Sequence, residues 1–170
     1  MKRLMNKIAI VTGASRVMGI GTAICRELAR EGADIFFTHW SNYDRQMKYF
    51  NDDDSVWSQH LMEEIRSFGV RCESMELDLS QPDAPRKLLD EVNERLGSPS
   101  ILVNNATYSV DVDFRSINAN ILDSHYGVNI RGTCLLTVEF ARQIEGKHGG
   151  RIINMVSGQD KSPEPGNLAY

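Results

Sequence analysis

The chain has 170 residues, of which 41% are hydrophobic, and carries a formal net charge of -4 at pH 7. This apolar content is sufficient for one globular domain and excludes an intrinsically disordered chain. An isoelectric point near 5.6 and the lack of a clustered basic segment argue against nucleic-acid binding. No run of about 18 apolar residues occurs, so we expect no membrane span.

The three cysteines, Cys25, Cys72 and Cys134, lie far apart and show no C-x-x-C spacing. An odd number at wide spacing is typical of reduced thiols in a cytoplasmic protein rather than of a disulfide framework. Residues 1–3 carry the positive charge of a secretory signal, but the apolar run that follows ends at residues 12–13 without a cleavage site. We therefore expect a cytoplasmic protein whose cysteines are structural.

Short apolar, β-branched runs alternate along the chain with longer segments whose apolar residues recur at helical spacing. This alternation is typical of βαβ units, which form a parallel sheet covered on both faces. We therefore predict an α/β fold, a doubly wound parallel sheet with helices on both faces, in which residues 1–170 form a single domain. The pattern predicts strands at residues 8–11, 35–38, 70–77, 101–103 and 151–156, and helices at residues 20–31, 56–68, 83–96 and 121–144.

The segment between residues 39 and 56 is polar and aromatic, and it is longer than most connections in such units. It contains Asn51 followed by Asp52, Asp53 and Asp54. A metal site built from these aspartates would need further ligands that the sequence does not show, so we expect no metal. We predict a solvated surface loop.

A glycine-rich turn follows the first predicted strand and leads into the first predicted helix. It runs Thr-Gly-Ala-Ser-Arg-Val-Met-Gly-Ile-Gly over residues 12–21. Such a turn presents free backbone N–H groups and the positive end of a helix, and glycine lets a phosphate approach without a Cβ clash. An ordinary tight turn is the alternative, but the position of the turn in a βαβ pattern favours a pyrophosphate site. The candidate residues of this site are Gly13, Ser15, Arg16, Gly19, Ile20 and Gly21.

The turn resembles the T-G-x-x-x-G-I-G turn of short-chain dehydrogenases/reductases, although two extra residues separate Gly13 from Gly19. Lengthened turns of this kind also resemble those of the enoyl-acyl-carrier-protein reductases, a divergent branch of the same superfamily. The resemblance to the family covers essentially all 170 residues. It implies a Rossmann-type fold, a nicotinamide dinucleotide cofactor, and the absence from this chain of the family's C-terminal strands.

The residues at the end of the second predicted strand bear on the choice between NAD(H) and NADP(H). An acidic residue there would accept a hydrogen bond from a free ribose 2′-hydroxyl and repel a 2′-phosphate. Here His39 is followed by no carboxylate until Asp44, while Arg16 and Arg45 could supply positive charge. In related reductases an arginine at the Arg16 position often accompanies NADP, so the resemblance favours NADP(H) over NAD(H). It also implies that His39 lies near the 2′-phosphate; a polar residue without a ligand role is the alternative.

Two further motifs follow the third and fourth predicted strands. Asp78 and Leu79 match the family's D-[VL] pair, which implies that Asp78 accepts a hydrogen bond from adenine N6. A helix-capping or turn role for Asp78 is the alternative. Residues 104–107, Asn-Asn-Ala-Thr, resemble the family's N-N-A-G, which implies that Asn105 and Ala106 lie beside the adenosine ribose. Twin asparagines are also ordinary turn formers, and the threonine in place of glycine predicts a less permissive backbone.

Ser157 follows the fifth predicted strand, and Tyr170 lies thirteen positions later, which matches the family's S-x12-Y spacing. Asn129 matches the asparagine of the family's helix between the fourth and fifth strands. Carbonyl reduction needs a hydride, which the cofactor carries, and a proton, which the protein must supply. The resemblance implies that Ser157 hydrogen-bonds the substrate oxygen, that Tyr170 exchanges the proton, and that Asn129 holds a water in the proton path. Taken singly, each could be an ordinary cap, packing or surface residue.

A tyrosine side chain with an ordinary pKa of about 10 is a poor proton shuttle near neutrality unless a nearby cation favours the phenolate. The family supplies this cation as a lysine four residues after the tyrosine, a position beyond residue 170. We therefore expect the sequence to be a fragment, a truncated product or part of a longer protein. We also expect the 170-residue chain alone to have little activity.

The resemblance as a whole implies an NADP(H)-preferring carbonyl reductase or alcohol dehydrogenase, similar to the 3-oxoacyl-acyl-carrier-protein reductases, that acts on a small-molecule substrate. It also implies a homodimer or homotetramer. Two alternatives stay open. The lengthened glycine turn suggests an enoyl reductase, although the spacing of Ser157 and Tyr170 opposes it. A chain that ends at residue 170 suggests a non-catalytic nucleotide-binding protein.

Overall fold

The computed structural model describes residues 2–46, 56–147, 149–159, 161–162 and 164–170. The centre of this described part is a five-stranded parallel sheet in the order β3-β2-β1-β4-β5. Its strands are β1 (Ile8–Val11), β2 (Asp34–His39), β3 (Cys72–Glu76), β4 (Ile101–Asn104) and β5 (Arg151–Asn154). The α-helices are α1 (Ile20–Arg30), α2 (Ser41–Asp44), α3 (Trp57–Ser67), α4 (Ala84–Arg95), α5 (Ala119–His125) and α6 (Thr133–Ile144), with a π-helical segment at Tyr126–Gly132 between the last two.

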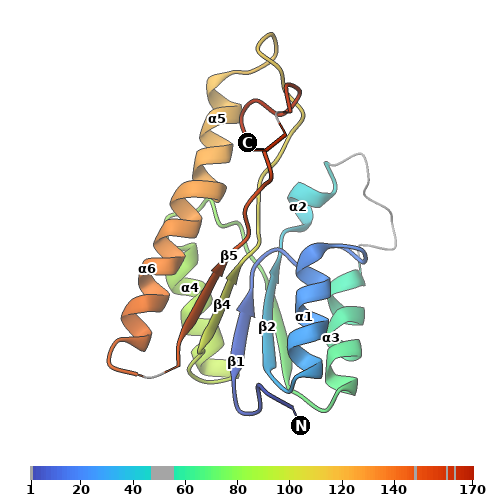
Figure 1. The fold of residues 1–170 in the computed structure, drawn as a ribbon, viewed down its shortest axis with the longest axis vertical. Helices are drawn as coiled ribbons and strands as arrows, with labels where there is room; N and C mark the ends of the chain where they lie inside the picture. Colours follow the sequence, from blue (N-terminus) through green and yellow to red (C-terminus); the bar gives the residue numbers. More distant parts are fainter. Residues whose placement is uncertain (1, 47–55, 148, 160, 163) are drawn as a thin grey trace.

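Helices cover both faces of the sheet, with α1 and α3 on one face and α4 and α6 on the other (Figure 1). Successive side chains of a strand point to opposite faces. Ala9 and Val11 therefore enter the hydrophobic core under α1 and α3, whereas Ile10 enters the core under α4 and α6. Phe36 and Phe37 of β2 divide between the two cores in the same way. Burial on both faces explains why these strands are nearly continuous apolar runs.

Strand β5 differs from the other strands because all of its residues are exposed. It lies at the edge of the sheet, beside β4. Ile152 and Ile153 are 36% and 45% exposed. In the described part of the chain, β5 therefore leaves two apolar side chains partly exposed.

The doubly wound parallel sheet predicted from the sequence is confirmed, and several predicted boundaries are corrected. Strand β3 begins at Cys72 rather than at residue 70, because the chain turns at Gly69, which has a left-handed φ of 81°. Strand β5 ends at Asn154, opposite the end of β4, rather than at residue 156. The connection after β2 was predicted to be a loop but begins with the short helix α2. The aspartates at 52–54 lie outside the described residues.

The helix predicted at residues 121–144 is interrupted by the π-helical segment. It also starts earlier than predicted, because Oδ1 of Asn118 accepts the N–H of Ile121 at 3.2 Å and caps α5. At the end of the π-helical segment, the N–H of Thr133 bonds to the carbonyl of Val128, five residues earlier. Isolated π-helical turns are rare in proteins, and those that occur are often found at functional sites. Asn129 lies in this one.

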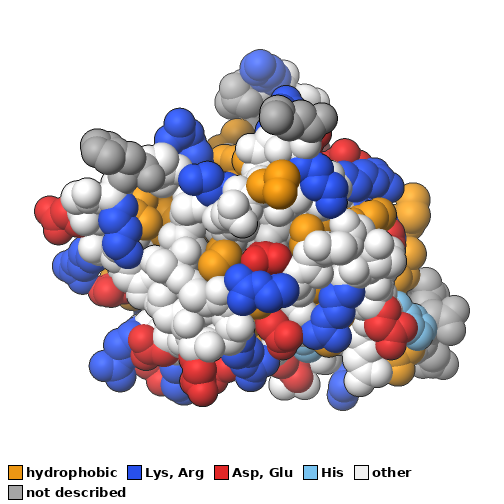
Figure 2. Space-filling model, turned by 90° about the horizontal axis from the view of Figure 1, so that it is seen from below, with side chains coloured by type: hydrophobic (Ala, Val, Ile, Leu, Met, Phe, Trp, Pro, Cys, Tyr) orange, Lys and Arg blue, Asp and Glu red, His pale blue; other side chains and the backbone are white. Residues whose placement is uncertain are grey.

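Figure 2 shows the face at the amino ends of the strands, where acidic and basic side chains are interspersed with a few apolar ones. Ion pairs bring opposite charges together, as between Arg71 and Asp34 at 2.7 Å and between Arg3 and Glu31 at 3.0 Å.

Within the described residues, no helix is both long enough and apolar enough to cross a bilayer.

Candidate active site

A cleft of about 440 Å³ opens at the carboxyl ends of the strands. The ends of β2, β4 and β5 and the segments that follow β1 and β3 line it. The strand order β3-β2-β1-β4-β5 reverses direction between β1 and β4. In open parallel sheets, ligands bind outside the carboxyl ends of the strands at this point of reversal. The glycine-rich turn follows β1 and therefore lies at the expected binding position.

The structure brings most of the predicted site residues to this cleft. Asp78 is not among the lining residues. Its carboxylate instead accepts the N–H of Ser80 at 2.8 Å and the side-chain amide of Gln81 at 3.0 Å. This is the turn role considered from the sequence, whereas contact with adenine stays a prediction. The lining includes the predicted catalytic residues Asn129, Ser157 and Tyr170, and the predicted cofactor residues Gly13, Ser15, Arg16, Gly19, Ile20, Gly21, His39, Leu79, Asn105 and Ala106.

Two glycines give the turn after β1 its close packing. Gly13 has a φ of 74°, and a Cβ at this position would lie 2.7 Å from Cα of Ala106. A Cβ on Gly21 would lie 2.6 Å from the carbonyl oxygen of Gly13. Because both separations are too short for a side chain, only glycine fits at either position. The result is a cradle of bare backbone, which we call the glycine cradle.

The glycine cradle leads directly into α1. The N-cap of this helix is Gly19, and no side chain of the described residues caps the first turn. The first N–H groups of a helix lack intrahelical partners and carry partial positive charge. An uncapped helix start beside bare backbone is therefore suited to binding a phosphate group.

The segment after β4 holds the glycine cradle from one side. Asn105 donates its side-chain amide to the carbonyls of Thr12 and Gly13, both at 2.9 Å. The backbone N–H groups of Asn105 and Ala106 both donate to the Thr12 hydroxyl at 3.0 Å. Asn104 donates to Oδ1 of Asn154 at 2.7 Å and so links β4 to β5. The twin asparagines thus stabilise this edge of the sheet rather than forming an isolated turn.

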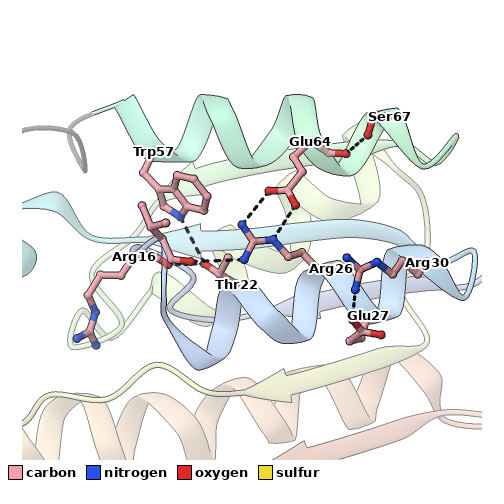
Figure 3. A network of polar contacts seen from close by, with 9 residues as sticks. Arg16, Thr22, Arg26, Glu27, Arg30, Trp57, Glu64 and Ser67 are labelled. Carbon is pink, nitrogen blue, oxygen red and sulfur yellow. Dashed lines mark hydrogen bonds and ion pairs between the residues drawn. The ribbon is translucent and has the colours of Figure 1, made fainter.

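A network of polar contacts holds the other side of the cradle (Figure 3). The hydroxyl of Thr22 donates to the carbonyl of Arg16 at 2.6 Å and accepts the indole N–H of Trp57 at 3.4 Å. Beside it, Arg26 forms a bidentate ion pair with Glu64, at 2.7 and 2.9 Å. The bond from Thr22 holds the backbone carbonyl of Arg16, while Figure 3 shows the Arg16 guanidinium pointing away from the network.

The end of β2 and helix α2 form the adjoining part of the cleft. Burial lowers the pKa of His39, although the nearby carboxylate of Glu76 opposes this effect. Helix α2 brings Asp44, which is 5% exposed, into the lining, so a carboxylate is closer to this region than the sequence suggested. Arg45 is exposed and does not line the cleft. The lining therefore contains one predicted cation, Arg16, and one acidic residue, Asp44, that was not among the predicted site residues.

A row of aromatic rings runs along the cleft. The ring centroids of Trp40 and Tyr43 are 6.2 Å apart, and those of Tyr43 and Tyr108 are 5.3 Å apart. The row continues to His125 at 5.1 Å and from there to Tyr170 at 6.4 Å. All of these residues except His125 line the cleft. Of the row, only Tyr170 was predicted as a site residue, because an aromatic residue outside a motif cannot be distinguished from core packing.

Asn129 clamps the segment after β4 to the π-helical segment. Its Oδ1 accepts the N–H of Tyr108 at 2.8 Å and the hydroxyl of Thr107 at 3.2 Å. Its Nδ2 donates to the carbonyl of Tyr108 at 2.9 Å. The threonine at 107 has no positive φ, so it replaces the family's glycine without backbone strain. Its hydroxyl donates a hydrogen bond to Oδ1 of Asn129.

Ser157 and Tyr170 lie in the segment after β5 and remain accessible from the cleft. Oγ of Ser157 accepts the N–H of Gln159 at 3.1 Å. Tyr170 is 43% exposed, and the N–H of Leu168 bonds to the carbonyl of Val112 at 3.0 Å just before it. This bond joins the end of the described chain to the segment after β4 and keeps the phenol at the cleft.

A doubly wound sheet with a glycine cradle at its point of reversal, and with asparagine, serine and tyrosine side chains in the same cleft, is the architecture of a dinucleotide-binding protein. Residues 7–170 match the sequence pattern of the family described as short chain dehydrogenase. The chain belongs to the short-chain dehydrogenase/reductase family.

Individual relatives agree with this assignment. The chain is 46% identical over 172 residues to the uncharacterized oxidoreductase YjdA of Bacillus subtilis (strain 168), a match that covers 100% of this chain and 64% of YjdA. It is 28% identical over 166 residues to the 3-oxoacyl-[acyl-carrier-protein] reductase FabG of Staphylococcus epidermidis, covering 98% and 62% of the two chains. A crystal structure of a short chain dehydrogenase from Burkholderia cenocepacia J2315 in complex with NADP superposes with a TM-score of 0.81 at 31% identity, over 96% of this chain and 61% of that chain. The chain thus spans less than two thirds of the length of these relatives.

Proposed function

We propose that the protein is an NADP(H)-preferring oxidoreductase that transfers hydride between the nicotinamide and a carbonyl or secondary alcohol of a small molecule. One observation carries this proposal: the glycine cradle and the side chains of Asn129, Ser157 and Tyr170 line the same cleft. Membership of the short-chain dehydrogenase/reductase family supports it. The similarity to FabG makes 3-oxoacyl thioesters the first substrates to test.

The residues of the cleft fit a nicotinamide dinucleotide. Bare backbone at Gly13 and Gly21 and the uncapped start of α1 would hold the pyrophosphate. Arg16 and His39 would lie toward a 2′-phosphate, and the segment after β4 would border the adenosine ribose. A bound NADP(H) supplies or accepts the hydride of the reaction.

Ser157 and Tyr170 would supply the proton chemistry. The N–H of Gln159 occupies one acceptor site on the Ser157 hydroxyl, which leaves the hydroxyl proton available for the substrate oxygen. The phenol of Tyr170 would donate the proton to this oxygen in reduction and remove it in oxidation. Asn129 would hold the wall of the cleft through its clamp on Tyr108 and support the proton path from the π-helical segment.

We also propose a homodimer or homotetramer in the cytoplasm. Leu122, Ile130 and Val138 follow one another at eight-residue intervals along α5, the π-helical segment and α6, and they are 49%, 59% and 38% exposed. These exposed apolar side chains would be available for a subunit interface. The free cysteines of the described chain fit a reducing compartment.

Turnover by the intact protein that contains these residues tests the proposed reaction. We expect NADPH consumption with at least one member of a panel of 3-oxoacyl thioesters and simple ketones. Tyr170→Phe keeps the ring and removes the proton donor, so kcat should fall by about 100- to 10,000-fold. The Kd of NADPH should not change, because this hydroxyl acts on the substrate oxygen. NADPH binding without consumption of any carbonyl would overturn the proposal and favour a non-catalytic nucleotide-binding protein.

A further inference from the structure

His125 lies behind the aromatic row and has no role in the mechanism given above. It is the last residue of α5 and precedes Asn129 by four positions, so the two side chains share a face of the helix. His125 is 4% exposed. Its ring packs edge-on against those of Tyr108 and Tyr170, with centroids 5.1 and 6.4 Å away. A buried imidazole therefore adjoins both the clamp made by Asn129 and the proposed proton donor.

The two nitrogens of this ring have different surroundings. Nδ1 lies 3.4 Å from Nδ2 of Asn129. Nε2 is buried and has no hydrogen-bond partner among the described residues. The backbone of Tyr108 identifies the two ends of the Asn129 amide, because its N–H must face Oδ1 and its carbonyl must face Nδ2. The group that His125 meets is therefore the amide donor.

An amide nitrogen can only donate, so Nδ1 of His125 must be the acceptor. This requires a neutral ring that carries its proton on Nε2. Burial lowers the pKa of His125, which favours the neutral ring. Among the described residues, the titratable side chains whose rings pack against it are the phenols of Tyr108 and Tyr170.

We propose that His125 is a positioning residue: its Nδ1 accepts the second amide proton of Asn129 and so completes the clamp on Tyr108 beside Tyr170. With this bond, Oδ1 and both protons of the Asn129 amide are held, and the amide cannot rotate. A proton on Nδ1 would place two donors face to face and break the bond. The effect on catalysis rests on the function proposed above, whereas the tautomer of His125 does not.

Two substitutions distinguish the role of the hydrogen-bond acceptor of His125 from the role of its aromatic ring. His125→Asn places an amide oxygen near the position of Nδ1 and keeps an acceptor for Asn129, whereas His125→Phe keeps an aromatic ring without one. In the intact protein, with the best carbonyl substrate, we expect kcat of His125→Phe to fall about 3- to 10-fold, the usual worth of one neutral hydrogen bond. The Kd of NADPH should stay at the wild-type value, and His125→Asn should recover most of the lost activity. His60→Asn, at an exposed position on α3, is the control and should behave as wild type.

These kinetics can contradict the proposal in two ways. Wild-type kcat in His125→Phe would show that the acceptor is dispensable. Equal impairment of His125→Asn and His125→Phe would show that the ring matters only for packing. In the wild type, activity should also fall on acidification as the ring gains its proton, and this acid limb should be absent from His125→Asn.

Nitrogen-15 NMR of the histidine rings, with the intact protein and no substrate, tests the geometry without turnover. The His125 signal is the one absent from the spectra of either variant. We expect the tautomer protonated on Nε2, and we expect it to stay neutral below the ordinary histidine pKa of about 6.5. A proton on Nδ1, or a charged ring at neutral pH, would overturn the proposal. The predicted tautomer in a protein that reduces no carbonyl would contradict only the proposed function.

Discussion

Substitution of Gly13 by alanine tests the steric basis of the glycine cradle. Gly13 and Gly69 share a left-handed conformation, with φ of 74° and 81°, but their surroundings differ. A Cβ at position 69 would meet nothing within 4 Å, whereas one at position 13 would lie 2.7 Å from Cα and 3.0 Å from Cβ of Ala106. Gly69→Ala is therefore a matched control that carries the backbone strain without the clash.

The two variants should lose different amounts of stability. The left-handed conformation costs an alanine about 1–2 kcal/mol, so Gly69→Ala should lower the free energy of unfolding by about this amount. Gly13→Ala adds overpacking of about 1–3 kcal/mol, for a total of about 2–5 kcal/mol. Relief of the clash must push the turn away from Ala106 and deform the cradle. NADPH affinity should therefore fall at least about tenfold in Gly13→Ala, which corresponds to about 1.4 kcal/mol.

Urea unfolding followed by circular dichroism measures the first effect, and titration of NADPH fluorescence measures the second. Gly69→Ala should keep the wild-type Kd for NADPH. Equal losses of stability in the two variants, together with a wild-type Kd in Gly13→Ala, would refute the steric explanation.

Three further measurements test other parts of the site and core. Arg16→Ala should weaken NADPH binding about 10- to 100-fold, the worth of one charge-assisted hydrogen bond, and change NADH binding by no more than about twofold; equal losses for both cofactors would contradict a contact with the 2′-phosphate. A thiol reagent should modify the exposed Cys134 rapidly in the native protein, but Cys25 and Cys72 only after unfolding. The reason is that burial raises the pKa of both buried thiols, that of Cys72 to about 12. Fast reaction of all three cysteines would show that the core is open. The free energy of unfolding should fall on acidification below about pH 6.5. The cause is that the pKa of His39 is lower in the folded state, so the unfolded chain binds the proton first. Urea titrations at several pH values should show a smaller decline in the free energy of unfolding for His39→Gln than for the wild type.

The fold could be predicted from the sequence because its central strands β1, β2 and β4 are almost wholly buried and therefore form compact apolar runs. The runs at β1 and β4 are short, lack charges and are flanked by turn residues, so their positions were predicted to within a residue. Helix α2 was missed because its four residues are too few to show a helical period. Its position depends on tertiary contacts, including the hydroxyl of Tyr43, which donates to the carbonyl of Ser109 at 2.9 Å.

The candidate site likewise contains parts that could be predicted from the sequence and parts that could not. The glycine turn and the residues after β4 could be predicted because each lies within one short stretch of chain. The π-helical segment could not, since its Asn129 bonds to Tyr108, 21 positions away, and no local propensity encodes that contact. His125 and Asp44 belong to no motif. Only the meeting of α2, α5 and the segments after β4 and β5 gives them a place beside the cleft.

The fate of the nicotinamide hydrogen tests most directly whether the protein reduces carbonyls by hydride transfer. The intact protein is given NADPH deuterated at both C4 positions, together with the best ketone of the panel in ordinary water, and the alcohol is analysed by mass spectrometry. We expect one deuterium on the carbon that bore the carbonyl oxygen, and almost no labelled alcohol from Tyr170→Phe. Alcohol without deuterium, or no alcohol from a protein saturated with NADPH, would contradict the proposed function.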